Sequence, residues 1–200
     1  MTAPVLRRPS ADESPAIAGL IAEAFAPLPV SGWLVPDPAA RRAVLAGNFE
    51  IMVEYALTFG LVYVTTDRSA VAVWFPRDGE PPPPPVDYDV RVERVCGEWT
   101  DRFLHLDDLF DANHPHEAHH HLAFLAVAPD RQGTGTGSAL LRHHHARLDA
   151  KGMPAYLEAS STRSRDLYLR HGYEVGPPFR VPDGTPFWPM WRRPQQPPAR

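Results

Sequence analysis

Residues His119–Lys151 read HHHLAFLAVAPDRQGTGTGSALLRHHHARLDAK, and this stretch decides the predicted fold. Its apolar run from Leu122 to Val127 is short, contains valine and phenylalanine and stops at Pro129, as expected of a β-strand. Glycines at alternate positions follow, and the good helix formers that begin at Ala139 predict a helix that stops at Gly152. The predicted order is therefore strand, glycine-rich turn and helix.

A glycine-rich turn that opens a helix is typical of an anion-binding site. The first N–H groups of a helix lack partners within it and lie at the positive end of its dipole. Glycines let the backbone approach a ligand closely. No lysine follows the glycines, which argues against the GxxxxGK[ST] motif of a nucleoside triphosphatase. Gly133, Gly135 and Gly137 also do not match the dinucleotide fingerprint GxGxxG, which opens a βαβ unit, whereas this turn lies past the midpoint of the chain.

The motif that does match is Gln-x-x-Gly-x-Gly, formed by Gln132, Gly135 and Gly137 directly after the strand. It resembles the acyl-CoA pyrophosphate loop of the GNAT superfamily of N-acetyltransferases. A second segment, Leu167-Tyr168-Leu169-Arg170-His171-Gly172-Tyr173, looks like the family's LYxxxGF ending. The resemblance covers nearly the whole chain, from Val5 to Arg193. The layout is similar to that of puromycin N-acetyltransferase and related bacterial members.

The resemblance implies an α/β fold of GNAT type. Its sheet is mixed but mostly antiparallel, with six to seven strands flanked by helices, and a parallel strand pair splays apart at the cofactor cleft, just after Val127. We expect one acetyltransferase domain, residues 1–193, and a disordered tail, 194–200, rich in proline and glutamine. The expected strands are 5–8, 61–66, 70–75, 122–127, 155–159, 173–175 and 185–191. Helices are expected from a cap at Ser10 or Asp12 to Phe25, and over 38–59, 86–113 with a break near Gly97, 139–150 and 163–171, with a loop over 27–38 and an extended crossover over 81–85.

Composition is that of an ordinary globular protein with no marks of nucleic-acid or membrane binding. The 200 residues suffice for one domain, and the net charge of −4 gives no basic surface for nucleic acid. No apolar run approaches the ~20 residues that span a bilayer. Without a hydrophobic signal core at the N-terminus, the expected location is cytoplasmic. The single cysteine, Cys96, excludes an internal disulfide, and the single lysine among many arginines indicates a GC-rich bacterial genome.

The resemblance implies acetyl-CoA as the cofactor and predicts its contacts. Backbone groups of Leu125, Ala126 and Val127 match positions that pair with the pantetheine chain in the family. Ser164 replaces an asparagine of the puromycin type and offers one hydroxyl in place of an amide. The predicted contacts of the pyrophosphate are Gln132, Gly133, Thr134, Gly135, Thr136, Gly137 and Ser138.

Acetyl transfer from a thioester to an amine needs an acid for the leaving thiolate. Tyr168 matches the family's tyrosine near the sulfur of coenzyme A. A phenol, whose ordinary pKa is ~10, is protonated at neutral pH and can donate that proton. The alternative is an aromatic packing residue on an amphipathic helix, which the neighbouring Leu167 equally supports.

The reaction also needs a base that takes a proton from the amine. His119 and His121 lie on one face of the predicted strand because side chains alternate with a period of two. His121 lies where some relatives place a glutamate base, and an imidazole is suited to proton removal. Glu158, on the neighbouring strand, is the competing base or a ligand of the amine. The alternative for the histidines is a surface cluster with His114, His116 and His120.

Two further histidine patterns are weaker. His144 to Asp149 matches HHxxxD, the signature of another acyltransferase class, but it lies within a predicted helix, where such histidines more often face solvent. The histidine runs lack a cysteine or acidic partner at zinc spacing, so no metal site is predicted.

The sequence thus predicts an N-acetyltransferase that transfers an acetyl group from acetyl-CoA to a small-molecule primary amine, by direct attack in a ternary complex. The alternatives are a protein N-acetyltransferase and a non-catalytic coenzyme A sensor. Aromatic residues near Trp33, in the helix from Pro38 and from Trp99 to Phe110 are expected to close the acceptor pocket. The expected partner is the amine acceptor, with no nucleic acid and no membrane, and a homodimer is left open.

Overall fold

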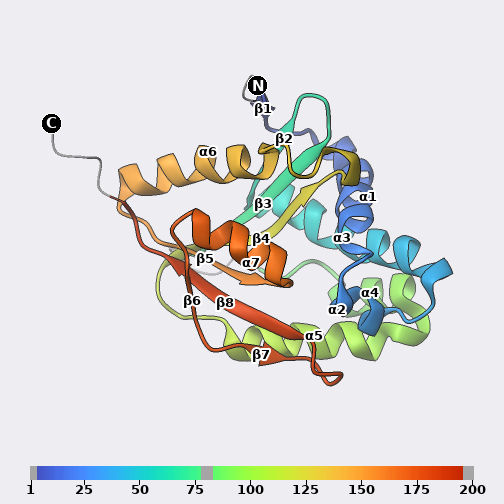
Figure 1. The fold of residues 1–200 in the computed structure, drawn as a ribbon. Helices are drawn as coiled ribbons and strands as arrows, with labels where there is room; N and C mark the ends of the chain where they lie inside the picture. The colour runs from blue at the N-terminus through green and yellow to red at the C-terminus, as the bar shows by residue number, and fades with distance from the viewer. Residues whose placement is uncertain (1–3, 78–82, 196–200) are drawn as a thin grey trace, which may run out of the picture.

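The computed structural model describes residues 4–77 and 83–195, in which a mixed sheet carries helices on both faces (Figure 1). The strands are β1 (Leu6–Arg7), β2 (Leu61–Thr65), β3 (Ala70–Arg77), β4 (His119–Val127), β5 (Ala155–Ala159), β6 (Glu174–Val175), β7 (Phe179–Arg180) and β8 (Pro186–Arg192). The helices are α1 (Ser14–Phe25), α2 (Pro29–Leu34), α3 (Pro38–Phe59), α4 (Tyr88–Cys96), α5 (Thr100–Asn113), α6 (Thr136–Lys151) and α7 (Thr162–Arg170), with short 3₁₀ turns at Ala11–Glu13, Gly97–Trp99 and Pro129–Arg131.

The longest helix, α3, has the bounds that the sequence predicts. Its first-turn proline follows Asp37, whose side chain accepts a hydrogen bond from the N–H of Ala39 at 2.9 Å. It ends at Gly60, where a β-carbon would lie 2.7 Å from the carbonyl oxygen of Trp74. Only glycine therefore lets the chain pass directly from this helix into β2.

The strands follow the order β1-β2-β3-β4-β5-β8-β6, with β7 paired to β8. As predicted, β4 and β5 are parallel and the other pairs are antiparallel. Among the described residues, the parallel ladder joins only His120 to Ala155 and His121 to Tyr156. The strands therefore separate after His121, so the prediction that they separate just after Val127 is wrong.

A β-bulge in β4 decides which side chains face which layer. The register against β3 shifts so that Ala123 opposes no residue of its own. Before the bulge His120 faces α6, since its ring contacts His144 of that helix. Beyond the bulge Leu125 and Val127 pack on the same side. His119 and His121, which alternate with His120, therefore point to the opposite face of the sheet.

Each face of the sheet buries its own core. Helices α1, α3, α4 and α5 cover one face with residues such as Ile21, Leu45 and Phe103. Helices α6 and α7 cover the other face, where Trp74 and Leu140 are fully buried. The first of these layers is the one toward which His121 points.

Two elements differ from the sequence-based prediction. Helix α2 lies within the predicted loop, because Pro29, which is expected to break a helix, occupies the first helical turn, where proline is favoured. Strand β7 adds an eighth strand to the six or seven expected, and two residues are too few to show an alternation.

Some predictions fall on residues outside the described ranges. Residues 78–82 include the first part of the predicted extended crossover, while residues 83–85 form neither helix nor strand. Residues 196–200 of the predicted tail are also outside. Within the described ranges, no helix is both long and apolar enough to cross a membrane.

Candidate active site

The glycine-rich turn between β4 and α6 is an open cradle of main chain. Gly133 and Gly135 have φ angles of +80° and +87°, a region that favours glycine. A β-carbon at either position would meet no other atom within 4 Å. The first α-helical hydrogen bond runs from the N–H of Ala139 to the carbonyl of Gly135, at 3.0 Å. The N–H groups of residues 136–138 therefore have no acceptor within the helix and suit a phosphate.

Side chains tie this turn to its neighbours. Gln132 donates from Nε2 to the carbonyl oxygen of Val127 at 3.2 Å, which links the turn to the end of β4. The Thr134 hydroxyl donates to the Arg131 carbonyl at 2.6 Å. Ser138 Oγ lies 2.8 Å from Nε2 of His171, directly after α7. The predicted pyrophosphate contacts are thus gathered at one end of the sheet.

The other predicted cofactor contacts differ in whether their side chains lie beside the glycine-rich turn or are engaged elsewhere. Leu125 and Val127 lie beside Gly137, whose added β-carbon would be 3.6–3.8 Å from their side chains, while Ala126 points into the core on the other face. The Ser164 hydroxyl is engaged locally, because it donates to the Ser161 carbonyl at 2.9 Å and completes the capping box of α7. A structural role thus accounts for this serine, and its contact with a cofactor stays a prediction.

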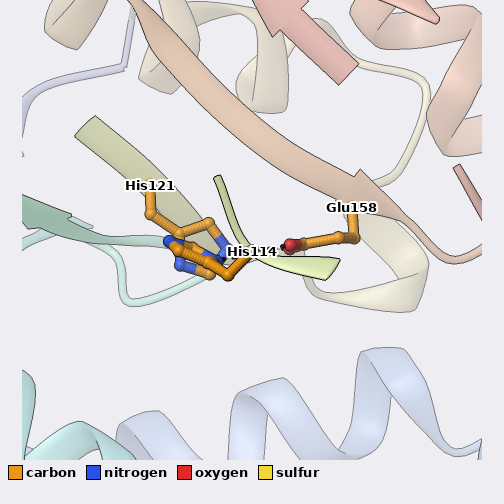
Figure 2. Close-up of side chains that lie close together, drawn as sticks. All are labelled: His114, His121 and Glu158. Carbon is orange, nitrogen blue, oxygen red and sulfur yellow. Dashed lines mark hydrogen bonds and ion pairs between the residues drawn. The ribbon is translucent and has the colours of Figure 1, made fainter. Parts of the chain in front are cut away.

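His121 and Glu158 form a hydrogen-bonded pair where β4 and β5 separate. Nε2 of His121 lies 2.8 Å from Oε2 of Glu158, across the two parallel strands (Figure 2). The Glu158 side chain is 4% exposed and that of His121 15%. Burial alone would raise the pKa of Glu158, but His121 and His114 together hold it below its usual value. The two competing candidates for the base are therefore contacting partners.

His119 lies deeper than His121 and is completely buried. Its Nδ1 lies 2.6 Å from the carbonyl oxygen of Glu117, and its Nε2 lies 3.2 Å from Nε2 of His114. Burial, and then the neighbouring His114 and His121, lowers the pKa of His119 to about 4. Because it has no exposed surface, His119 contacts its neighbours and not the solvent.

His114 is a neighbour of the pair that the sequence placed only in a surface cluster. It follows the end of α5, and its Nδ1 lies 3.7 Å from Oε1 of Glu158. Figure 2 shows its ring beside that of His121, with both near the Glu158 carboxylate. A histidine in an irregular segment carries no periodicity that would place it, so no sequence signal identifies this contact.

Tyr168 lies on α7 and packs on the opposite face of the sheet. It belongs to the core with Leu140 and Leu157, and its ring centroid is 5.6 Å from that of Tyr173. Burial raises the pKa of the Tyr168 phenol, so the group is protonated at neutral pH. Both interpretations of the sequence meet here, because Tyr168 is a packing residue and also a protonated phenol.

One expectation about the histidines is wrong. His144 and His145 do not face solvent: α6 lies on the sheet, His144 stacks on Trp74 with ring centroids 4.2 Å apart, and Nε2 of His145 lies 3.0 Å from the Tyr173 hydroxyl. The histidine run of β4 has no acidic partner at zinc spacing in the sequence, but the fold brings Glu158 to it from 37 residues away.

The aromatic residues expected to line an acceptor pocket pack on the core. Trp33 lies against His105 with ring centroids 6.2 Å apart, Phe103 is buried, and Phe110 contacts the rings of Phe179 and Phe187. These contacts make them part of the layer beneath the histidine cluster, and the outline of an acceptor pocket stays a prediction.

Comparison with known proteins gives consistent relatives. Residues 102–175 match the family model of the acetyltransferase (GNAT) domain. A Corynebacterium glutamicum protein described as "histone acetyltransferase HPA2 and related acetyltransferase" is 30% identical, with a TM-score of 0.73, and the match covers 99% of this chain and all of the other.

Two further similarities are more limited. An amino-acid acetyltransferase of Ralstonia nicotianae is 42% identical over 60 residues, which are 30% of this chain and only 13% of that protein. The PaiA N-acetyltransferase of Thermoplasma acidophilum, solved in complex with coenzyme A, has a TM-score of 0.58 at 10% identity, and the match covers 96% of this chain and 99% of that one. At this identity the likeness concerns the fold alone.

Proposed function

The chain belongs to the GNAT family of acetyltransferases, and from this premise we propose that it acetylates the primary amine of a small molecule with acetyl-CoA. The observation that carries the proposal is the His121–Glu158 pair at the point where β4 and β5 separate. A buried carboxylate beside an imidazole attracts an ammonium group and orients the ring that takes its proton. Acetyl-CoA supplies the acetyl group as a thioester when it is bound.

Binding of acetyl-CoA is assigned to the glycine-rich turn. The open space over Gly133 and Gly135 and the free N–H groups at the start of α6 fit a pyrophosphate. The predicted contacts over residues 132–138 all lie within this segment. The residues present therefore fit the cofactor that the family uses.

The two proton-transfer roles fall on opposite faces of the sheet. His121 takes the proton of the amine, with Glu158 holding the ring in place. Tyr168, whose raised pKa keeps the phenol protonated at neutral pH, donates a proton to the leaving thiolate from the α7 side. Because β4 and β5 are unpaired beyond His121, the proposed reaction takes place in the gap between these strands. His121 acts there from one face of the sheet and Tyr168 from the other.

Direct attack of the amine is preferred over transfer through an acetylated cysteine. The chain has a single cysteine, Cys96, and it is buried. Burial raises the pKa of the Cys96 thiol to about 12, so little thiolate forms at neutral pH. A ternary complex of enzyme, acetyl-CoA and amine is therefore the proposed arrangement.

The names of the relatives offer two classes of acceptor, and the proposed one is the small-molecule amine. The Ralstonia nicotianae relative is named for amino acids, which are small amines, and the Corynebacterium glutamicum relative is named for histones. A protein amine is accordingly the second candidate. A closer relationship to puromycin N-acetyltransferase, a cytoplasmic location and a homodimer stay predictions.

Initial-rate kinetics with a panel of small primary amines and lysine peptides test the proposal. Varying acetyl-CoA and the best amine together should give intersecting double-reciprocal lines, and mass spectrometry should show one acetyl group on the amine. Parallel lines would contradict the ternary complex, and faster acetylation of peptides would favour the protein acceptor. Acetyl-CoA binding without thiol release from any amine would favour a coenzyme A sensor.

A further inference from the structure

A cluster of two imidazoles and one carboxylate occupies the end of the parallel ladder. His114, His121 and Glu158 each offer a ligand atom, and these atoms all lie within 4.8 Å of one another. In Figure 2 the rings and the carboxylate gather around one point, although they come from the segment after α5, from β4 and from β5. The histidine side chains are 20% and 15% exposed, so a small ion can reach them from solvent.

One atom of this cluster lacks a partner. Oε1 of Glu158 is buried and accepts no hydrogen bond, although Oε2 of the same carboxylate lies 2.8 Å from His121. A buried carboxylate oxygen without a hydrogen-bond donor costs free energy, because it has lost its hydrogen bonds to water and no protein donor replaces them. Nδ1 of His114 lies 3.7 Å from Oε1, which is too far for a hydrogen bond.

The hydrogen bonds behind His114 determine which of its nitrogens is free. The Glu117 carbonyl can only accept, so Nδ1 of His119 donates to it. In the neutral His119 ring Nε2 then accepts, and the donor to it is Nε2 of His114. The nitrogen of His114 that is not used by His119 is therefore Nδ1, and it is the one that lies toward Glu158. An imidazole nitrogen and a carboxylate oxygen in this arrangement are ligand atoms that one cation can bridge.

We propose that His114, His121 and Glu158 form a binding site for a divalent ion of the zinc class. Zinc bonds of ~2.0–2.1 Å in a tetrahedron place neighbouring ligand atoms ~3.3 Å apart. The two contacts of Glu158, at 2.8 Å and 3.7 Å, lie on either side of this spacing. Three protein ligands leave the fourth position of a zinc ion open to water. His119 holds the His114 ring from behind, as partners of metal-bound histidines do.

The ligand set also selects the ion. Two imidazole nitrogens and one carboxylate suit zinc, cobalt, nickel or copper, whereas magnesium and calcium require mostly oxygen ligands.

The consequence for catalysis rests on the proposed function. An ion held by Nε2 of His121 displaces the hydrogen bond between that atom and Glu158, which positions the ring in the proposed mechanism, so the ion inhibits acetyl transfer.

Metal binding is measured directly on the full chain, with no acceptor present. The protein is stripped with a chelator, freed of it and titrated with zinc chloride against a chromophoric competitor. We expect one zinc per chain, and at least about tenfold weaker binding in His114→Ala and in Glu158→Gln, since loss of even a supporting residue costs that much. Cobalt in the same site should give the strong visible absorption of four-coordinate geometry.

His116→Ala is the matched control, because its exposed side chain lies two residues from His114. It should bind zinc as the wild type does, and circular dichroism checks that each variant is folded. Equal zinc affinity in wild type and both ligand variants, or a loss in His116→Ala alone, overturns the proposal. Zinc binding without inhibition of acetylation would overturn only its catalytic consequence, and absent acetylation with intact zinc binding would overturn only the proposed function.

Discussion

Oε2 of Glu158 lies 2.8 Å from Nε2 of His121, and this contact joins side chains of β4 and β5 that are 37 residues apart in the sequence. In the proposed mechanism the two candidate bases therefore act as one unit, in which the imidazole exchanges the proton and the carboxylate positions the imidazole. Because His121 belongs to the last residue pair of the parallel ladder, the pair with Glu158 lies where the sheet begins to open.

Gly135→Ala should weaken acetyl-CoA binding. The added β-carbon meets a φ of +87°, which costs about 1–2 kcal/mol, and it occupies the space of the ligand. Loss of one hydrogen bond to a charged phosphate, about 1.5–3 kcal/mol, corresponds to about ten- to hundredfold weaker binding. Isothermal titration calorimetry measures this affinity.

Gly184→Ala is the control for backbone strain, since Gly184 has a φ of +90° in the turn between β7 and β8. Both variants should lose similar stability, but only Gly135→Ala should lose affinity. Equal acetyl-CoA affinity in the two variants would remove the glycine-rich turn from the cofactor site.

Tyr168→Phe should lower kcat by about a hundredfold, the usual contribution of one acid–base group, and leave the KM for acetyl-CoA nearly unchanged. The variant keeps the ring that packs in the core and removes only the proton donor. Tyr173→Phe is the matched control, because it is equally buried and its hydroxyl contacts His145. A similar kcat in Tyr168→Phe and wild type would show that Tyr168 only packs.

Stability should fall as the pH is lowered, because α6 buries neutral histidines. Burial, and then neighbouring positive charges, lowers the pKa of His144 to about 2, whereas an unfolded histidine titrates near ~6.5. Between these two pH values His144 binds a proton in the unfolded chain but not in the folded chain. The stabilisation is therefore complete above pH ~6.5 and is lost on acidification. Each such proton lowers the free energy of unfolding by about 1.4 kcal/mol per pH unit.

Urea unfolding from pH 7 to pH 5 checks this expectation. His144→Phe keeps an aromatic ring on Trp74 but cannot titrate, so its stability should depend less steeply on pH than that of the wild type. His116→Phe, at an exposed position, should keep the wild-type slope. Identical slopes for His144→Phe and wild type would mean that His144 is charged in the folded protein.

Local patterns predicted most of the fold. The glycine-rich turn, the proline in the first turn of α3 and the two β-rich runs of β2 and β3 each place an element by its own chemistry. Helix α2 and strand β7 were not predicted, because a short helix between prolines and a two-residue strand have no period.

The candidate site was predictable only as separate residues. Alternation along β4 placed His119 and His121 on one face, and that prediction is confirmed. The position of Glu158 depends on strand pairing across an intervening helix, and that of His114 on the path of an irregular segment. Neither distance is encoded in local spacing, so the buried pair and the contact with His114 appear only in the folded chain.

The most direct measurement of the central claim is single-turnover acetyl transfer by His121→Ala, with the best amine and saturating acetyl-CoA. We expect a rate about 10²- to 10⁴-fold below wild type, as for loss of one general base, and partial recovery when imidazole is added. Glu158→Gln, which keeps a hydrogen-bond acceptor, should show a smaller loss of rate, and added imidazole should not restore that rate. A wild-type rate in His121→Ala, or recovery by imidazole in Glu158→Gln alone, would contradict the assignment of His121 as the base.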